Sequence, residues 1–196
     1  MRSVIAVILL ASLVVTTPAS AQHGGGAANL TVTAPREVSQ FDFMVGEWDL
    51  DVRVPATTFA TKIHGMPKLV GTWRVRKALD GWGLEDDMKI TDVAGNPKSL
   101  SHAVRYFDRN TGKWAISGLD VYRGKFSTST AEWRGNDMYL SGSGKDAGGN
   151  TQMIRTRIYD ISQSGFKFRQ EKSADHGKTW KETISIEARR ASRNPA

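Results

Sequence analysis

Hydrophobic and polar residues alternate with a period of two from about residue 47 to residue 189, and no long stretch shows a helical period. A two-residue period is typical of β-strands that bury one face. The pattern predicts ten strands, at Glu47–Val54, Leu69–Leu79, Trp82–Thr91, Leu100–Phe107, Lys113–Tyr122, Phe126–Arg134, Met138–Gly144, Thr151–Ile161, Phe166–Ser173 and Lys178–Arg189.

The segments between these strands are mostly short and rich in glycine, asparagine and aspartate, as in Asp80-Gly81 and Ser164-Gly165. Such residues adopt the positive φ that tight hairpin turns need. Short connections make neighbouring strands antiparallel, and a meander of about ten strands removes its exposed edges by closing. We therefore expect an all-β protein, a single antiparallel up-and-down β-barrel with an interior.

The N-terminal region divides into three parts. Residues 1–21 combine a basic start, an apolar run at 4–15 and a small-x-small site, which predicts a signal peptide cleaved after Ala21. Residues 22–35 contain three consecutive glycines and no periodicity, so they are interpreted as a flexible tail. The barrel domain is then residues 36–191, and Arg36 to Val45 would form a short helix or 3₁₀ turn that buries Phe41 with Phe43 or Met44.

Composition changes the picture in two ways. The chain has no cysteine, so its core must be stable without disulfides after export to the periplasm or medium. Removing Arg2 from 27 basic residues leaves 26 against 20 acidic ones, a mature net charge of +6. The basic residues are dispersed and no nucleic-acid-binding motif is present, which argues against a nucleic-acid partner. Weak, salt-dependent attraction to a membrane surface stays open.

A resemblance supports the barrel. The segment Phe41-Asp42-Phe43 with Gly46 and Trp48, followed by Thr111-Gly112-Lys113-Trp114 and the Ser173 to Trp180 segment, resembles a bacterial family of secreted proteins of unknown function. The resemblance implies a calycin-like or lipocalin-like barrel with a cavity and no established activity. The Gly46-x-Trp48 pair also resembles the first-strand signature of lipocalins, in which the tryptophan closes the bottom of the cavity.

The leading hypothesis is that the barrel binds a small, largely apolar molecule. Aromatic side chains in the apolar phase would line or floor the cavity, namely Trp48, Trp73, Trp82, Trp114 and Phe168. Arg155 or Arg157 would hold a polar head group if their face of the strand turns inward. An interior ion-pair network, or a one-residue shift that puts these charges in water, is the alternative.

Two other functions stay open. Asp86 shares a face with Leu84 and Met88, and Glu182 shares one with Ile184. With His102 they suggest a small-molecule isomerase or hydrolase, although no catalytic set is assigned. The third hypothesis is an envelope interaction module whose barrel is filled solidly by side chains.

Metal and cofactor signals are weak. The four histidines, at positions 23, 64, 102 and 176, form no pair at ligand spacing, so no metal site is predicted and no cofactor is assigned. Haem is a minority hypothesis, with His64 or His102 as its ligand inside the barrel. The segment Ser173 to Trp180 matches the Asp-box of sialidase propellers once, which favours a hairpin turn over a carbohydrate site.

Overall fold

The structure is a computed structural model that describes residues 33–56, 63, 65–146 and 148–192. The expected signal peptide at 1–21 and residues 22–32 of the expected tail lie outside these residues, so both stay predictions. Within the described part of the chain, no helix combines the length and apolar character needed to cross a membrane.

Ten antiparallel strands form one closed barrel in which every strand pairs with its neighbours in the chain, and β1 pairs with β10. This confirms the expected all-β, up-and-down barrel, and its architecture is consistent with a lipocalin-like fold. The strands are β1 Gly46–Arg53, β2 Leu69–Ala78, β3 Gly83–Asp92, β4 Pro97–Asp108, β5 Lys113–Asp120, β6 Lys125–Arg134, β7 Asp137–Lys145, β8 Thr151–Tyr159, β9 Gly165–Ser173 and β10 Lys181–Arg190.

Every strand end agrees with the predicted one to within three residues, and two of the differences have local causes. The last strand begins at Lys181 and not at Lys178, because Ser173 to Trp180 folds as a hydrogen-bonded turn. Strand β8 ends at Tyr159, before the predicted Ile161, because Asp160 has a φ of 52° that interrupts the extended backbone.

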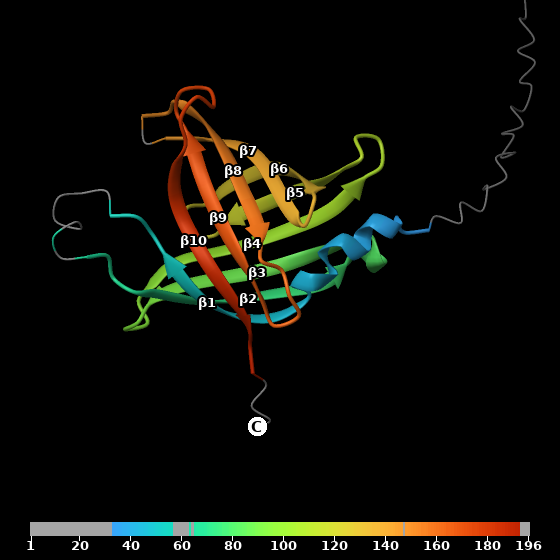
Figure 1. The fold of residues 1–196 in the computed structure, drawn as a ribbon, viewed down its shortest axis with the longest axis horizontal. Helices are drawn as coiled ribbons and strands as arrows, with labels where there is room; N and C mark the ends of the chain where they lie inside the picture. Colours follow the sequence, from blue (N-terminus) through green and yellow to red (C-terminus); the bar gives the residue numbers. More distant parts are fainter. Residues whose placement is uncertain (1–32, 57–62, 64, 147, 193–196) are drawn as a thin grey trace, which may run out of the picture. The chain divides into compact units, whose positions relative to one another are not determined.

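Consecutive antiparallel strands place their connections at alternate ends of the barrel (Figure 1). The 3₁₀ helices η1 (Arg36–Met44) and η2 (Leu79–Gly81) lie at one end, which we call the closed end. The opposite, open end carries the β1–β2, β3–β4, β5–β6, β7–β8 and β9–β10 connections. The long β1–β2 connection belongs to this end, and its described residues lead to and from it.

Helix η1 plugs the closed end with aromatic and sulfur-containing side chains. Phe41 and Met44 are completely buried, and the Phe41 ring meets Trp114 edge to face with centroids 4.7 Å apart. The Trp48 indole donates a hydrogen bond to the Met44 carbonyl at 2.6 Å, and the Trp114 indole donates one to Gln40 Oε1 at 2.9 Å. The predicted short helix with buried Phe41 and Met44 is confirmed.

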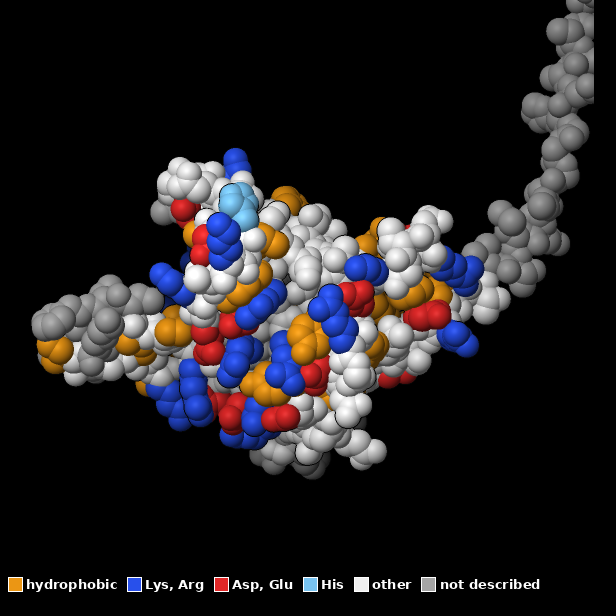
Figure 2. All heavy atoms as spheres, turned by 45° about the horizontal axis from the view of Figure 1, so that its top comes forward, with side chains coloured by type: hydrophobic (Ala, Val, Ile, Leu, Met, Phe, Trp, Pro, Cys, Tyr) orange, Lys and Arg blue, Asp and Glu red, His pale blue; other side chains and the backbone are white. Residues whose placement is uncertain are grey.

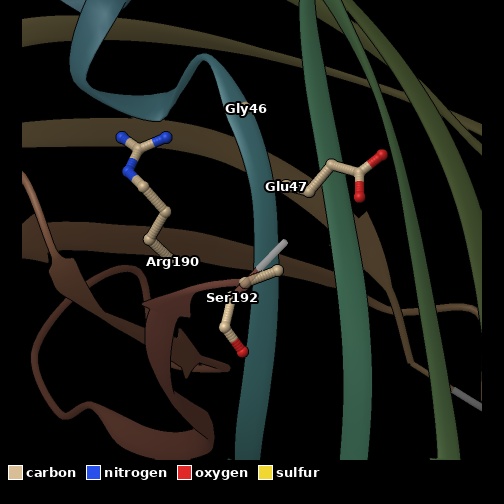
Figure 3. Close-up of a pocket in the computed structure, with 5 residues that line it drawn as sticks. Gly46, Glu47, Arg190 and Ser192 are labelled. Atoms are coloured by element: carbon tan, nitrogen blue, oxygen red, sulfur yellow. The ribbon is translucent and has the colours of Figure 1, made fainter. Parts of the chain in front are cut away.

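Arg190, at the end of β10, contacts the residues at the start of β1. Its guanidinium lies 4.1 Å from the Trp48 ring centroid and donates to the carbonyls of Gln163 and Val45. In Figure 3 the guanidinium lies beside the turn that leads into Gly46, whose φ of 134° suits glycine. The adjacent surface groove, of about 630 Å³, therefore borders an Arg190 that is already committed to structural contacts.

Candidate functional site

The barrel interior is packed differently in its two halves. Toward the closed end the inward side chains are large, and Trp48, Trp73, Trp114 and Phe166 pack against one another or against η1. Toward the open end of β5, β6 and β7 the residues in the same inward phase are small. They lie at even spacing from the buried Ile116, Ala131 and Met138 on the same strands and therefore face inward too. These small residues are Gly118, Ser127, Ser129, Gly142 and Gly144.

A cavity of about 150 Å³ lies against this wall of small residues. Its hydrogen-bonding groups include the hydroxyls of Ser127 and Ser129 on β6 and Thr156 on β8. Close strand packing limits what can replace the small residues, because a Cβ at Gly142 would lie 3.0 Å from the Thr128 carbonyl oxygen. The cavity therefore exists because glycine and serine occupy positions where the other half of the barrel has large side chains.

Strands β7, β8 and β9 give the cavity its apolar surface and one amide. Leu140, Ile154 and Phe168 line it, together with Gln170. The Gln170 Oε1 accepts a hydrogen bond from Thr183 Oγ1 at 3.2 Å, so the Gln170 amide has its nitrogen left to donate. None of the described residues that line the cavity is charged. The site is thus suited to an uncharged molecule with apolar and hydrogen-bonding parts.

A buried ion pair lies in the barrel core, on β3 and β4. Asp86 and Arg105 are 3% and 5% exposed, and the Arg105 guanidinium contacts Asp86 Oδ2. The other carboxylate oxygen, Oδ1, accepts a hydrogen bond from the Trp73 indole at 2.6 Å. Burial lowers the pKa of Arg105 to about 10, so the side chain stays charged at neutral pH.

The structure brings together only some of the residues that the sequence suggested. Trp48, Trp73, Trp114 and Phe168 lie inside the barrel, as expected, and Phe168 is the one of these that lines the cavity. Trp82 does not line the interior with Leu84. It directly follows η2 as its C-cap, with helical dihedrals, so the strand alternation starts only at Gly83. The Arg109 guanidinium lies over the Trp82 ring.

Arg155 and Arg157 lie on the outer face of β8, so the expectation that they reach into the barrel is wrong. The inward side chains of β8 are those of Ile154, Thr156 and Ile158. Arg155 and Arg157 each lie one position away and therefore point to the opposite face. Arg155 donates to Glu171 at 2.6 Å, and Arg157 donates to Asp137 at 2.7 Å. Both carboxylates come from neighbouring strands.

The three groups of the enzyme hypothesis do not share a pocket. Asp86 faces inward, whereas Glu182 forms an ion pair with the half-exposed Arg169 on the outer face. His102 also faces outward, where its Nδ1 lies 2.9 Å from Asp87 Oδ1. His102 therefore cannot ligate haem inside the barrel, and His64 lies outside the described residues. Among the residues described, no group of three or more potential metal ligands occurs.

A second hollow lies on the outer face of β7 to β9. A groove of about 480 Å³ runs between arginine and aromatic side chains, with Arg155 stacked 4.2 Å from the Trp180 ring centroid. Figure 2 shows basic, acidic and hydrophobic side chains interleaved over the outer surface of the barrel. Because Arg155, Arg157 and Arg169 each have a carboxylate partner, the groove offers little uncompensated charge.

The turn from Ser173 to Trp180 is held by its own side chains. Asp175 accepts hydrogen bonds from the Thr179 backbone nitrogen at 2.9 Å and from the Thr179 hydroxyl at 2.6 Å. The Trp180 indole donates to the Gly177 carbonyl. These bonds from Thr179, together with one from the Ser173 hydroxyl, hold the pKa of Asp175 well below its usual range. The segment is a hairpin turn, as predicted.

The β3–β4 turn gives a pH-dependent prediction. The side chain and then the backbone of Asn96 donate to Asp92 and lower the pKa of that carboxyl to about 2. Since the folded pKa lies below the unfolded value of about 3.9, the stabilisation is complete above that value and is lost as the pH falls toward 2. Asn96→Ala should raise the pKa of Asp92 toward 3.9 in a carboxyl ¹³C NMR titration.

The control for this experiment is Asp146, which has the same arrangement with Asn150 in the β7–β8 turn, where the pKa is also lowered. Its titration should not move in Asn96→Ala. An unchanged Asp92 titration would show that other donors, Lys98 included, keep the carboxylate charged.

No protein-family model matches the chain, and no curated protein matches it either.

Proposed function

We propose that this protein, exported to the periplasm or medium, binds a small uncharged molecule in the open half of the barrel. The observation that carries the proposal is the cavity of about 150 Å³ bounded by the small inward residues of β6 and β7 and by Phe168. Pockets for drug-sized ligands occupy about 300–1,000 Å³, so the ligand is smaller than these or inserts only one end.

The lining defines the chemistry of the ligand. The hydroxyls of Ser127, Ser129 and Thr156 and the Gln170 amide would bind one or two polar groups, and Phe168 would pack on an apolar body. A charged ligand is disfavoured because no described side chain in the lining would pair with its charge, and an unpaired buried charge is costly. Arg105 does not change this, since its charge is balanced by Asp86.

The test is native mass spectrometry of the protein recovered gently from its own cell envelope, followed by a denaturing spectrum. An extra mass that is lost on denaturation is expected. Ser129→Leu should fill the cavity and lower the occupied fraction about tenfold or more, which corresponds to a loss of about 1.4 kcal/mol or more in binding free energy. The spectra of wild-type and variant protein give the occupied fractions directly.

Thr130→Leu is the matched control, because Thr130 is the next residue on β6 and is exposed on the outer face. It adds the same side chain without entering the cavity, so occupancy should stay at the wild-type level. If the wild-type protein is recovered bare, or if both variants lose the passenger equally, the cavity is not a binding site.

A further inference from the structure

The exposed hydrophobic side chains of the described residues are concentrated at the open end of the barrel. Nine large hydrophobic side chains are exposed, and two of them, Leu79 and Tyr106, lie toward the closed end. The other seven lie on connections or strand ends at the open end, namely Ile63, Met66, Val93, Val121, Tyr122, Phe126 and Met153. Clusters of this kind mark interaction sites more often than isolated exposed residues do.

The tip of the β5–β6 hairpin carries three of these seven side chains, Val121, Tyr122 and Phe126. Residues 121–126 read Val-Tyr-Arg-Gly-Lys-Phe, and all six are exposed. Phe126 is 83% exposed although it is the second residue of β6, and its cross-strand partner is the half-buried Leu119 on the same outer face. Among the described residues, neither Tyr122 nor Phe126 belongs to the hydrophobic core, so both rings are accessible to a partner.

Two cations lie among the apolar side chains of this tip. Arg123 is paired with Asp120 at 2.7 Å, and its side chain is still 59% exposed. Lys125 has no acidic side chain within ion-pairing distance among the residues that the structure describes. Tyrosine, phenylalanine and long basic side chains together suit the interface of a lipid bilayer, where rings enter the headgroup region and cations meet lipid phosphates.

A β-strand partner is a poor fit at this place. Strands β5 and β6 are paired on both sides in the closed barrel, so neither offers a free edge for another chain. The contact must therefore be made by side chains. The tip also lies at the same end as the cavity, and inward-facing Ser127 follows Phe126 directly on β6.

We propose that the β5–β6 tip docks the open end of the barrel on an anionic lipid surface. Phe126 and Tyr122 enter the headgroup region, and Arg123 and Lys125 bind the lipid phosphates. The cavity then faces the membrane. Docking depends only on the tip, so this inference does not rest on the proposed ligand-binding function.

The absence of native cysteine permits a site-specific test. In the chain recovered from the cell envelope, Phe126→Cys carries an environment-sensitive nitrobenzoxadiazole label, and Tyr106→Cys carries the same label toward the closed end. Vesicles of equal phosphatidylglycerol and phosphatidylcholine should blue-shift and brighten the label at 126 and leave the label at 106 unchanged. Phosphatidylcholine vesicles alone, or high salt, should weaken the response.

Vesicle co-sedimentation of unlabelled variants measures the strength of docking. Phe126→Ser should reduce partitioning about tenfold, and Lys125→Ser about fivefold, as expected for one aromatic side chain and one cation at an anionic surface. Arg36→Ser removes one exposed cation from η1 at the closed end and should change partitioning little.

Three outcomes would overturn the proposal. Equal responses at positions 106 and 126 would indicate binding through another part of the chain. No response at 126 would remove the docking surface. A response at 126 that depends on protein concentration without vesicles would identify the tip as a contact between copies of the chain.

Discussion

Replacing Asp86 by asparagine is expected to lower the free energy of unfolding by about 3–5 kcal/mol, the usual cost of removing one partner from a buried ion pair. The variant leaves the Arg105 guanidinium buried and charged with no counter-ion. Asparagine keeps an oxygen that accepts the hydrogen bond from the Trp73 indole. The lost free energy of unfolding therefore measures the effect of removing the negative charge. Urea denaturation of wild type and variant measures it.

Arg105 has little capacity to compensate for this loss. It is 5% exposed, and its Nε already has no hydrogen-bond partner among the described residues. Its guanidinium lies 5.6 Å from the Phe41 ring centroid, which contributes a weak cation–π contact but no balancing charge. The unpaired group would have to lose its proton or draw water into the core, and both are unfavourable.

Two companion variants separate the charge from general disruption of the core. Adding Arg105→Met to Asp86→Asn removes the stranded charge, so the double variant should be more stable than Asp86→Asn alone. Glu171→Gln breaks the exposed pair with Arg155 and should cost about 0–1 kcal/mol. A loss below about 1 kcal/mol in Asp86→Asn would mean that water already reaches Arg105.

The same pair shows how far sequence reasoning extends into the interior. The alternation around Asp86 correctly indicated an inward carboxylate, and a buried carboxylate needs a cation. The inward arginines suggested from the sequence were Arg155 and Arg157, for a ligand head group or an interior ion-pair network, whereas the structure pairs Asp86 with Arg105. Strand β4 has hydrophobic residues on both faces, Val104 on one and Phe107 on the other, so its phase was ambiguous and His102 was given the inward side.

The cavity was harder to predict than the barrel. Strands and turns are specified by residues that are close together in the sequence. A two-residue alternation marks a strand, and a pair such as Ser164-Gly165 marks a turn. The cavity depends instead on which inward residues become neighbours across strands, as Ser129 and Gly142 do. Small residues on β5 to β7 predict a cavity only after it is known which residues of each strand face inward.

Replacing Phe41 by alanine is expected to cost about 3–5 kcal/mol, which is typical for emptying a fully buried aromatic position. Phe41 is a residue of η1, and its side chain is completely buried. Its ring lies against Trp114 and near Phe43. A 3₁₀ helix of nine residues has little stability of its own, so its attachment to the barrel depends on such side chains. Urea denaturation measures the loss.

Tyr106→Ala is the matched control for aromatic truncation, because Tyr106 is exposed near the same end of the barrel. Its effect should stay within about 0.5 kcal/mol. If Phe41→Ala is equally mild, η1 is not required for barrel stability. Amide hydrogen exchange distinguishes the two mechanisms of loss, since detachment of η1 alone would deprotect Val38 and Met44 without deprotecting the strands.

A comparison of Phe41→Ala with Ser129→Leu distinguishes effects on the free energy of unfolding from effects on ligand binding. The proposed cavity lies in the open half of the barrel, and Phe41 seals the closed end. We therefore expect Phe41→Ala to lower the free energy of unfolding while the folded fraction keeps its passenger. Ser129→Leu should do the reverse and lose the passenger at nearly unchanged stability. Loss of the passenger from folded Phe41→Ala protein would instead place the ligand against η1.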